Sequence, residues 1–289
     1  AHYGVENVGA TVVPMSTGNT KKLITMMNDF GATGIMCTPS YLLHIAETLY
    51  ETGEINNIKL KAAVCGAEPW TEKMRHQIEE KLHVNCFDIY GLSEIMGPGV
   101  ACDCIEHKGL HVQEDHFLPE IVARGTLEPV ADGELGALVF TTLTKEGIPL
   151  IRYRTKDLTS IDRTPCACGR TTARIARFKG RSDDMLVLRG VNVFPSQIEA
   201  ALLEMDGILP HYMIIVDRVN NLDTIEVQVE VEERFFSDEI KELEKLTKRI
   251  ESVIKTAIGL AVKVKLVEPK RLERAEGKSV HVTDKRVFD

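Results

Sequence analysis

Residues 180–195 read Gly-Arg-Ser-Asp-Asp-Met-Leu-Val-Leu-Arg-Gly-Val-Asn-Val-Phe-Pro. In this stretch an arginine and two acids follow a glycine turn and precede an apolar run of strand type, and a second glycine turn follows the run. Two polar motifs lie upstream of it, Tyr-Gly-Leu-Ser-Glu at 90–94 and Tyr-Arg-Thr-Lys-Asp at 153–157. The pattern of the chain changes across the stretch, and we place a domain boundary between residues 182 and 183.

The region before this boundary combines two patterns. Up to about residue 110, the apolar runs 34–38, 62–66 and 85–90 alternate with helical segments, which predicts a parallel sheet. Ligands bind at the carboxyl ends of strands in such sheets, and Gly66 and Gly91 lie at two of these ends. Residues 111–182 hold short strand candidates separated by Gly, Pro and Asp, which predicts a small distorted antiparallel barrel. The fold class is therefore α/β.

The region after the boundary, residues 183–289, predicts a small α+β domain. Its expected order is a helix at 195–205, strands at 212–217 and 224–231, a helix at 237–258 and a strand at 262–267. Apolar residues keep a helical period along one face of the second helix.

The composition limits the classes of function that the protein can have. The net charge of −8 argues against nucleic acid as the main partner, because phosphate binding needs clustered Lys and Arg. No apolar run is long enough to span a bilayer, and the first residues lack the features of a signal peptide, so we expect a cytoplasmic protein without a membrane partner.

Seven cysteines are an odd number, which favours reduced thiols or metal ligation over a disulfide framework. The chain begins without Met, and residues 10–14 already read as a buried strand, so we expect an N-terminal portion to precede it.

Together, the motifs at 90–94, 153–157 and 180–195 resemble those of adenylate-forming ligases, and most closely those of the phenylacetate–coenzyme A ligase family. The resemblance implies a large AMP-binding domain followed by a small mobile one. It also implies ATP-dependent conversion of phenylacetate, or a related aryl acid, to its coenzyme A thioester through an acyl-adenylate. The expected partners are then the acid, ATP or AMP, Mg²⁺ and coenzyme A, and a homodimer is a family expectation.

The resemblance assigns a nucleotide site to the upstream motifs. It implies that Tyr90 holds adenine, Ser93 a phosphate and Glu94 Mg²⁺, while Asp157 accepts the ribose hydroxyls and Arg181 contacts ribose and phosphate. Further residues beside the adenine are then Gly66, Ala67, Glu68, Asp88, Ile89 and Gly91. From the residues alone, an ordinary turn, strand–helix packing and a solvated Asp–Arg pair remain open alternatives.

The same resemblance gives roles to the C-terminal domain. Asp183 matches the hinge, and Gly190 belongs to the turn that rotation presents to the active site. Many superfamily members have Arg where this chain has Asn192, a departure that the phenylacetate–coenzyme A ligase branch shares. Lys278 matches the adenylation lysine, although a lysine on a polar tail is usually only solvated.

The expected aryl pocket is lined by Tyr3, Ala67, Ile89 and Pro98, which match the family by position. Each of these side chains is also apolar enough for ordinary core packing.

A cysteine-rich constellation stands apart from these motifs. Its members are Cys102, Cys104, His107, His111, Cys166 and Cys168. Three thiolates and one imidazole can hold a structural zinc ion, but the spacing alone leaves buried free thiols equally open. The resemblance favours Cys104, His111, Cys166 and Cys168 as ligands, with Cys102 and His107 as spares.

Two other functions remain open. The chain lacks the phosphate-binding loop of the superfamily, since Ser-Thr-Gly-Asn-Thr at 16–20 contains no lysine, so a nucleotide-binding module without turnover is one alternative. The other is an adenylyltransferase of the coenzyme F390 synthetase type, which passes the nucleotide to a deazaflavin.

Overall fold

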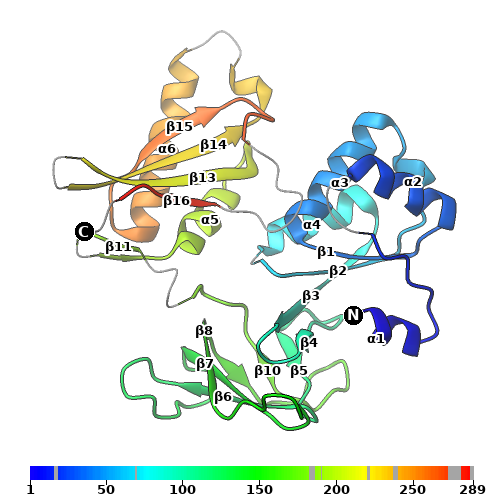
Figure 1. The fold of residues 1–289 in the computed structure, drawn as a ribbon. Helices are drawn as coiled ribbons and strands as arrows, with labels where there is room; N and C mark the ends of the chain where they lie inside the picture. Colours follow the sequence, from blue (N-terminus) through cyan, green and yellow to red (C-terminus); the bar gives the residue numbers. More distant parts are fainter. Residues whose placement is uncertain are drawn as a thin grey trace. The chain divides into compact units, whose positions relative to one another are not determined.

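The computed structural model describes residues 1–15, 19–68, 70–181, 186–189, 191–219, 222–236, 240–272 and 281–286. These residues form two compact units, one made of most of residues 1–178 and one that contains the described residues from 179 onward (Figure 1). The predicted boundary at 182/183 and the predicted functional residues Asp183, Gly190 and Lys278 lie outside the described residues, so all of them stay predictions.

The larger unit contains the predicted parallel sheet. Strands β1 (Gly34–Cys37), β2 (Ala62–Gly66) and β3 (Asn85–Leu92) are parallel neighbours in that order. Parallel strands need crossover connections, and helices α3 (Pro39–Thr52) and α4 (Glu72–Leu82) supply them, with a short 3-10 turn η1 (Ile55–Asn57) after α3. Helix α2 (Thr20–Phe30) precedes β1 and contacts α3 (Figure 1). These predicted strands and helices are confirmed.

The ends of helix α2 show how local sequence sets the element boundaries. The Asn19 side chain accepts the Lys22 N–H at 2.9 Å, which satisfies one of the donors that a helix start leaves without a partner. Gly31 ends the helix in the left-handed conformation, with φ +57°, which glycine adopts without steric cost.

The sheet continues beyond β3 through antiparallel strands. β4 (Gly97–Cys102), β5 (Leu110–Val112), β10 (Arg174–Ile175) and β9 (Ile161–Asp162) follow in that spatial order. A second sheet contains β6 (Phe117–Val122), β7 (Gly136–Thr142) and β8 (Tyr153–Thr159). One apolar core draws buried residues from both sheets, among them Val112, Ile175 and Phe140. The strands expected to form a separate barrel are therefore divided between two sheets that share one core, because β3 turns back into β4 and extends the first sheet.

The N-terminal segment differs from its prediction. Residues 10–14 form no strand, and the side chains of Val12 and Val13 are only half-buried. A strand needs a neighbour for its N–H and C=O groups, and none of the described strands pairs with this segment. The short helix α1 (His2–Asn7) before it was not expected.

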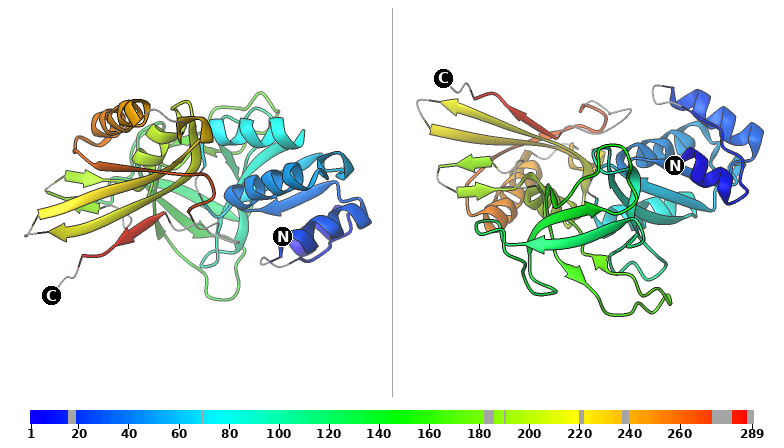
Figure 2. Two further views of the ribbon diagram at one scale, coloured as in Figure 1. Left: turned by 90° about the horizontal axis from the view of Figure 1, so that it is seen from above. Right: turned by 60° about the horizontal axis from the view of Figure 1, so that its bottom comes forward.

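The smaller unit is a four-stranded sheet with helices on one face. The order is β15 (Lys263–Val267), β14 (Leu222–Val231), β13 (Ile208–Val219) and β16 (Val282–Asp284), with β13 and β14 antiparallel and the outer strands parallel to their neighbours. Helices α5 (Pro195–Leu203) and α6 (Ile240–Ile258) lie on the same side of the sheet (Figure 2) and share its apolar core. A 3-10 turn, η2 (Glu233–Phe236), follows β14.

Part of the stretch 180–195 forms a hairpin of β11 (Leu186–Leu188) and β12 (Val191–Val193). The predicted α+β order is thus confirmed for this unit, apart from β16, which the sequence did not suggest. None of the helices in the described part of the chain combines the length and apolar character needed to cross a bilayer.

Candidate nucleotide and metal sites

The carboxyl ends of β2 and β3 meet at one edge of the sheet. Gly66, the last residue of β2, pairs with Ile89 of β3. Residues 66–68 and 89–94, which supply most of the predicted nucleotide contacts, therefore lie at the same edge of the sheet. This is the edge where open α/β sheets bind ligands.

Two glycines at this edge are needed for strand packing. A Cβ atom on Gly66 would lie 2.3 Å from the carbonyl oxygen of Ile89, and one on Gly91 would lie 2.2 Å from the carbonyl oxygen of Gly97. Close packing of the strands therefore requires glycine at both positions, whether or not a ligand binds here. Ala67, next to Gly66, has a positive φ of 70°, which is uncommon for a residue with a side chain and often marks a functional turn.

Tyr90 and Asp157 meet although 67 positions separate them in the chain. The Tyr90 hydroxyl donates to Asp157 Oδ2 at 2.5 Å. Tyr90 stands near the end of β3 and Asp157 in β8, so the hydrogen bond joins the two sheets of the larger unit. Asp157 is only 8% exposed, and the ring of Phe178 lies 4.5 Å from that of Tyr90. A carboxylate held so firmly beside an aromatic ring suits a ribose-binding role.

A bulge in β8 sets the direction of the Asp157 side chain. The pairing of β8 with β7 shifts register here, and Lys156 takes a positive φ of 70°. The Thr155 hydroxyl stabilises the bulge, because it donates to the Leu138 carbonyl and accepts the Asp157 N–H, both at 3.1 Å. Bulges of this kind often re-aim side chains next to active sites.

Ser93 and Glu94 occupy the exposed turn between β3 and β4. Lys145, in the loop between β7 and β8, donates its ammonium to the Glu94 carbonyl at 2.6 Å. This lysine was not among the predicted site residues, and no sequence motif singled it out. The turn thus presents a carboxylate, a hydroxyl and a neighbouring cation at the same edge of the sheet as Tyr90.

Two acids predicted beside the adenine also have structural contacts. Glu68 Oε1 accepts the N–H of Ser40 at 2.8 Å, so the carboxylate lies at the start of α3, where the helix dipole favours negative charge. The Asp88 carbonyl accepts the Asp103 N–H at 2.8 Å, which ties β3 to the loop after β4. Neither contact tests a role in nucleotide binding.

The predicted aryl-pocket residues are spread over several elements. Ala67, Ile89 and Pro98 belong to the neighbouring segments around β2, β3 and β4, with Pro98 paired to Gly91. Tyr3 instead lies on α1, with a side chain that is 79% exposed. Arg181 belongs to the smaller unit. The pocket and the contribution of Arg181 stay predictions.

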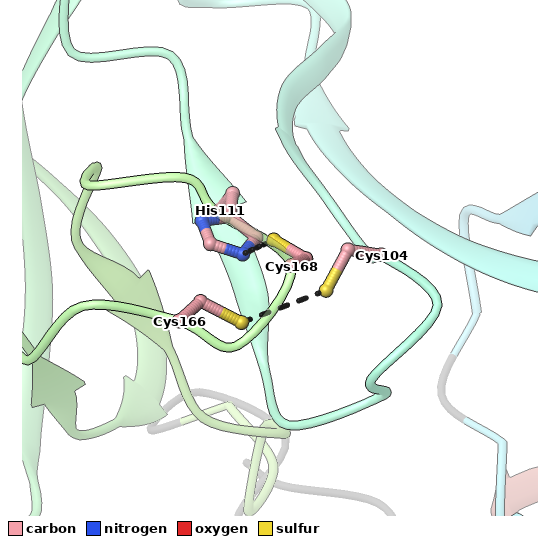
Figure 3. A group of neighbouring side chains, drawn as sticks. All are labelled: Cys104, His111, Cys166 and Cys168. Carbon is pink, nitrogen blue, oxygen red and sulfur yellow. Dashed lines mark hydrogen bonds between the residues drawn. The ribbon is translucent and has the colours of Figure 1, made fainter.

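The four favoured cysteine and histidine side chains converge into one cluster (Figure 3). Cys104 follows β4, His111 lies in β5, and Cys166 and Cys168 lie in the turn between β9 and β10. The Cys104 and Cys166 sulfurs are 3.9 Å apart, and the Cys168 sulfur lies 3.5 Å from His111 Nε2. All four ligand atoms lie within 4.8 Å of one another.

The 3.9 Å and 3.5 Å separations are close to those of a tetrahedral zinc site. Zn–S bonds of about 2.3 Å and a Zn–N bond of about 2.0–2.1 Å place neighbouring sulfurs about 3.8 Å apart and sulfur and nitrogen about 3.6 Å apart. His111 Nδ1 lies 3.1 Å from the Thr172 hydroxyl, which orients the ring and leaves Nε2 facing the sulfurs. Thr172 was missed by the sequence analysis, although it lies close to the Cys-x-Cys pair in the chain.

The protonation of the cluster follows from its surroundings. Burial raises the pKa of the Cys104 thiol to about 11, and the Arg170 backbone N–H lowers the pKa of Cys168 to about 7. Burial lowers the pKa of His111, which favours the neutral imidazole that a metal requires. The predicted spare His107 instead pairs with Asp103, at 2.5 Å between Nδ1 and Oδ2.

Comparisons with known proteins agree with this architecture. A family model described as the C-terminal domain of AMP-binding enzymes matches residues 190–286. Phenylacetate–coenzyme A ligase of Thermus thermophilus is 48% identical over 96% of this chain, and that of Escherichia coli is 46% identical over 99%. The chain spans 65% of the length of each of these relatives.

Solved structures show the same fold. 2-Hydroxyisobutyryl-CoA ligase, in its postadenylation state with the adenylate R3-HIB-AMP, superposes with a TM-score of 0.89 at 27% identity. That match covers 99% of this chain and 62% of the ligase. A benzoate CoA ligase from Burkholderia xenovorans, at 16% identity and a TM-score of 0.65 over 94% of this chain and 55% of the ligase, supports the fold alone. Over nearly its whole length the chain is therefore a homologue of the phenylacetate–coenzyme A ligases, with the fold of the adenylate-forming coenzyme A ligases.

Proposed function

We propose that the chain carries the nucleotide-binding edge and the C-terminal domain of an ATP-dependent ligase that joins phenylacetate, or a closely related aryl acid, to coenzyme A. The observation that carries this proposal is the Tyr90–Asp157 hydrogen bond at the carboxyl end of the parallel strands. It brings together the two side chains that would hold the adenine and the ribose. The homology to phenylacetate–coenzyme A ligases supplies the substrate class.

The reaction has two steps. In the first, a carboxylate oxygen of the acid attacks the α-phosphorus of ATP, and pyrophosphate leaves. In the second, the thiol of coenzyme A attacks the acyl carbonyl, loses its proton, and AMP leaves. Both steps depend on positioning and charge neutralisation more than on covalent help from the protein.

The residues divide this work. Tyr90 and Asp157 fix the nucleoside, Arg181 adds a cation near the ribose and phosphate, and Ser93 donates to a phosphate oxygen. Glu94 would hold Mg²⁺, which neutralises phosphate charge when bound. Lys278, which lies outside the described residues, would place its ammonium between the acid's carboxylate and the α-phosphate.

Separate assays of the two half-reactions test this assignment. In the intact protein, Lys278→Ala should abolish pyrophosphate release from ATP and phenylacetate while sparing thioester formation from supplied phenylacetyl-adenylate. Equal loss in both assays would contradict the proposed role of Lys278. Nucleotide binding by the wild type without pyrophosphate release would instead identify a binding module, and transfer of AMP to a deazaflavin would identify an adenylyltransferase.

A panel of acids tests the substrate class. We expect phenylacetate to give faster coenzyme A-dependent AMP release than benzoate, 2-hydroxyisobutyrate or acetate. Preference for an aliphatic acid would contradict the aryl assignment. The homodimer, the hinge at Asp183 and the aryl pocket stay predictions; light scattering tests the first.

We also propose that the cluster of Cys104, His111, Cys166 and Cys168 binds a structural zinc ion. The four ligand atoms lie within 4.8 Å of one another, two of their separations are close to tetrahedral spacing, and the ion would tie the segment after β4 to the turn between β9 and β10. Metal analysis of the purified protein should find about one zinc per chain. Cys166→Ser should lose the metal, whereas the matched control Cys102→Ser should retain it.

A further inference from the structure

A lysine from the second sheet of the larger unit reaches the turn that carries Ser93 and Glu94. The Lys145 ammonium donates to the carbonyl oxygen of Glu94 at 2.6 Å, across 51 positions of the chain. Among the residues that the structure describes, this carbonyl is the one partner of the ammonium, and no carboxylate forms an ion pair with it. The lysine therefore brings a positive charge that no acid neutralises to the carboxyl edge of the parallel strands.

Hydrogen bonds fix the backbone from which Lys145 projects. At the end of β7, the Thr142 N–H donates to the Leu150 carbonyl at 2.9 Å, and the Thr142 hydroxyl accepts the Leu150 N–H at 2.9 Å. These two bonds close the base of the loop between β7 and β8. The Thr144 hydroxyl lies 2.7 Å from His116 Nδ1, which ties the loop to the segment before β6. Lys145 thus follows two anchored residues, which limits where its side chain can point.

The turn that accepts the ammonium is anchored as well. Ile95, the residue after Glu94, is 0% exposed and packs in the apolar core that the two sheets share. Its N–H donates to the Leu92 carbonyl at 3.2 Å, which closes the turn. Tyr90, four residues before Glu94, is held by its hydrogen bond to Asp157. The ammonium and the two side chains proposed to hold the nucleoside therefore belong to one fixed framework within the larger unit.

The proposed contacts along this framework give the nucleotide a direction. Adenine and ribose lie at Tyr90 and Asp157, and the phosphates extend toward Ser93 and Glu94. The Lys145 ammonium lies against the backbone of Glu94, at the phosphate end of this series. An ammonium has three donors, and the Glu94 carbonyl uses one, so two remain for phosphate oxygens. A phosphate chain longer than that of AMP is what these donors can bind.

We infer that Lys145 is a further binding residue of the nucleotide site, whose ammonium contacts the β- or γ-phosphate of ATP and stabilises the pyrophosphate as it leaves. This inference rests on the proposed function. During adenylation the bond from the α-phosphorus to the bridging oxygen breaks, and its electron pair stays on the pyrophosphate. A fixed cation beside that group offsets the charge that develops there, and no proton needs to move. AMP and the acyl-adenylate lack these phosphates, so Lys145 should not affect their binding.

Titrations of Lys145→Met in the intact protein, with magnesium present and the acid absent, test the inference. Methionine keeps most of the side-chain length but has neither the charge nor the donors. We expect the affinities for ATP and for pyrophosphate to fall about tenfold, with the affinity for AMP within about twofold of wild type. Pyrophosphate release from ATP and phenylacetate should also fall about tenfold or more, whereas thioester formation from supplied phenylacetyl-adenylate should not change. Lys145→Arg keeps the cation and should recover most of the ATP affinity.

Lys81→Met is the matched control. Lys81 is half-buried like Lys145 and belongs to the same unit, but it lies in the last turn of α4, near the amino end of β3 and thus at the opposite edge of the sheet. Its ammonium lies 5.3 Å from the centre of the Tyr50 ring. The control removes the same charge from the chain and should leave the affinities for ATP, pyrophosphate and AMP unchanged. If Lys145→Met does not fold, Lys145→Gln, which keeps an N–H donor without the charge, should give the same difference between ATP and AMP.

The inference is overturned if Lys145→Met binds ATP and pyrophosphate as tightly as the wild type does. It is also overturned if the affinity for AMP falls as far as that for ATP, because the lysine would then only hold the turn. A wild type that binds neither ATP nor pyrophosphate would overturn it too. Failure of the proposed function would appear differently, as a wild type that binds ATP and pyrophosphate through Lys145 but forms no phenylacetyl-adenylate.

Discussion

Replacing Tyr90 with Phe removes one hydroxyl from the nucleotide edge and leaves the ring in place. In the wild type this hydroxyl donates to Asp157 at 2.5 Å, and Asp157 is 8% exposed. A hydrogen bond to a charged group contributes about 1.5–3 kcal/mol, and its loss leaves a largely buried carboxylate short of a donor. We therefore expect the free energy of unfolding to fall by about 1.5–3 kcal/mol.

The same change should weaken nucleotide binding. Without the Tyr90 hydroxyl, the Asp157 side chain must be ordered when the ribose binds. Immobilising one side chain costs about 0.5–1.5 kcal/mol, so the affinity for AMP should fall about two- to tenfold. Denaturant unfolding measures the first quantity and isothermal titration with AMP the second.

The control is Tyr50→Phe, which removes an exposed hydroxyl that donates to the Lys81 carbonyl at 3.2 Å. It should change stability by no more than about 0.5 kcal/mol and leave AMP affinity unchanged. The reasoning is refuted if Tyr90→Phe behaves like Tyr50→Phe in both assays, since the hydroxyl would then neither stabilise the fold nor orient the carboxylate.

Three further predictions concern other parts of the molecule. Removing zinc with a chelator, or replacing Cys104 with Ser, should lower the Tm of the larger unit, whereas a Tm unaffected by chelation would argue against a structural ion. Gly66→Ala should lower the free energy of unfolding by about 1–3 kcal/mol, because the added Cβ would meet a backbone oxygen of β3 that cannot move aside. Gly125→Ala is the control in the same unfolding assay, because a Cβ atom there would meet no atom within 4 Å. In the smaller unit, the Arg286 guanidinium lowers the pKa of Asp284. This pair therefore stabilises the fold above the unfolded pKa of about 3.9, and its contribution is lost as the pH falls below that value. Arg286→Met should flatten this acid-side loss in pH-dependent unfolding, and an identical pH profile would contradict the assignment.

Local pattern accounted for most elements of the fold. The apolar runs at β1, β2 and β3, and the helical segments between them, predicted elements that the structure contains at nearly the same bounds. These elements form from nearby residues, so their periodicity is visible in a short window. β4 was missed because its Gly-Pro-Gly start is typical of a turn, and β16 was missed because it is short and pairs with β13, a strand far earlier in the chain.

The candidate site was predictable only in part. The meeting of Tyr90 and Asp157 followed from motif resemblance, since no property of either residue alone reveals a partner 67 positions away. The metal cluster also needed the resemblance to select four of six candidates.

The most direct test of the account is the affinity of the intact protein for AMP with and without the Asp157 carboxylate. Isothermal titration should show saturable binding by the wild type and at least about tenfold weaker binding by Asp157→Ala, with zinc content and folded structure unchanged. Equal affinity in the two folded proteins would contradict the placement of the mononucleotide between Tyr90 and Asp157, and with it the proposed ligase site.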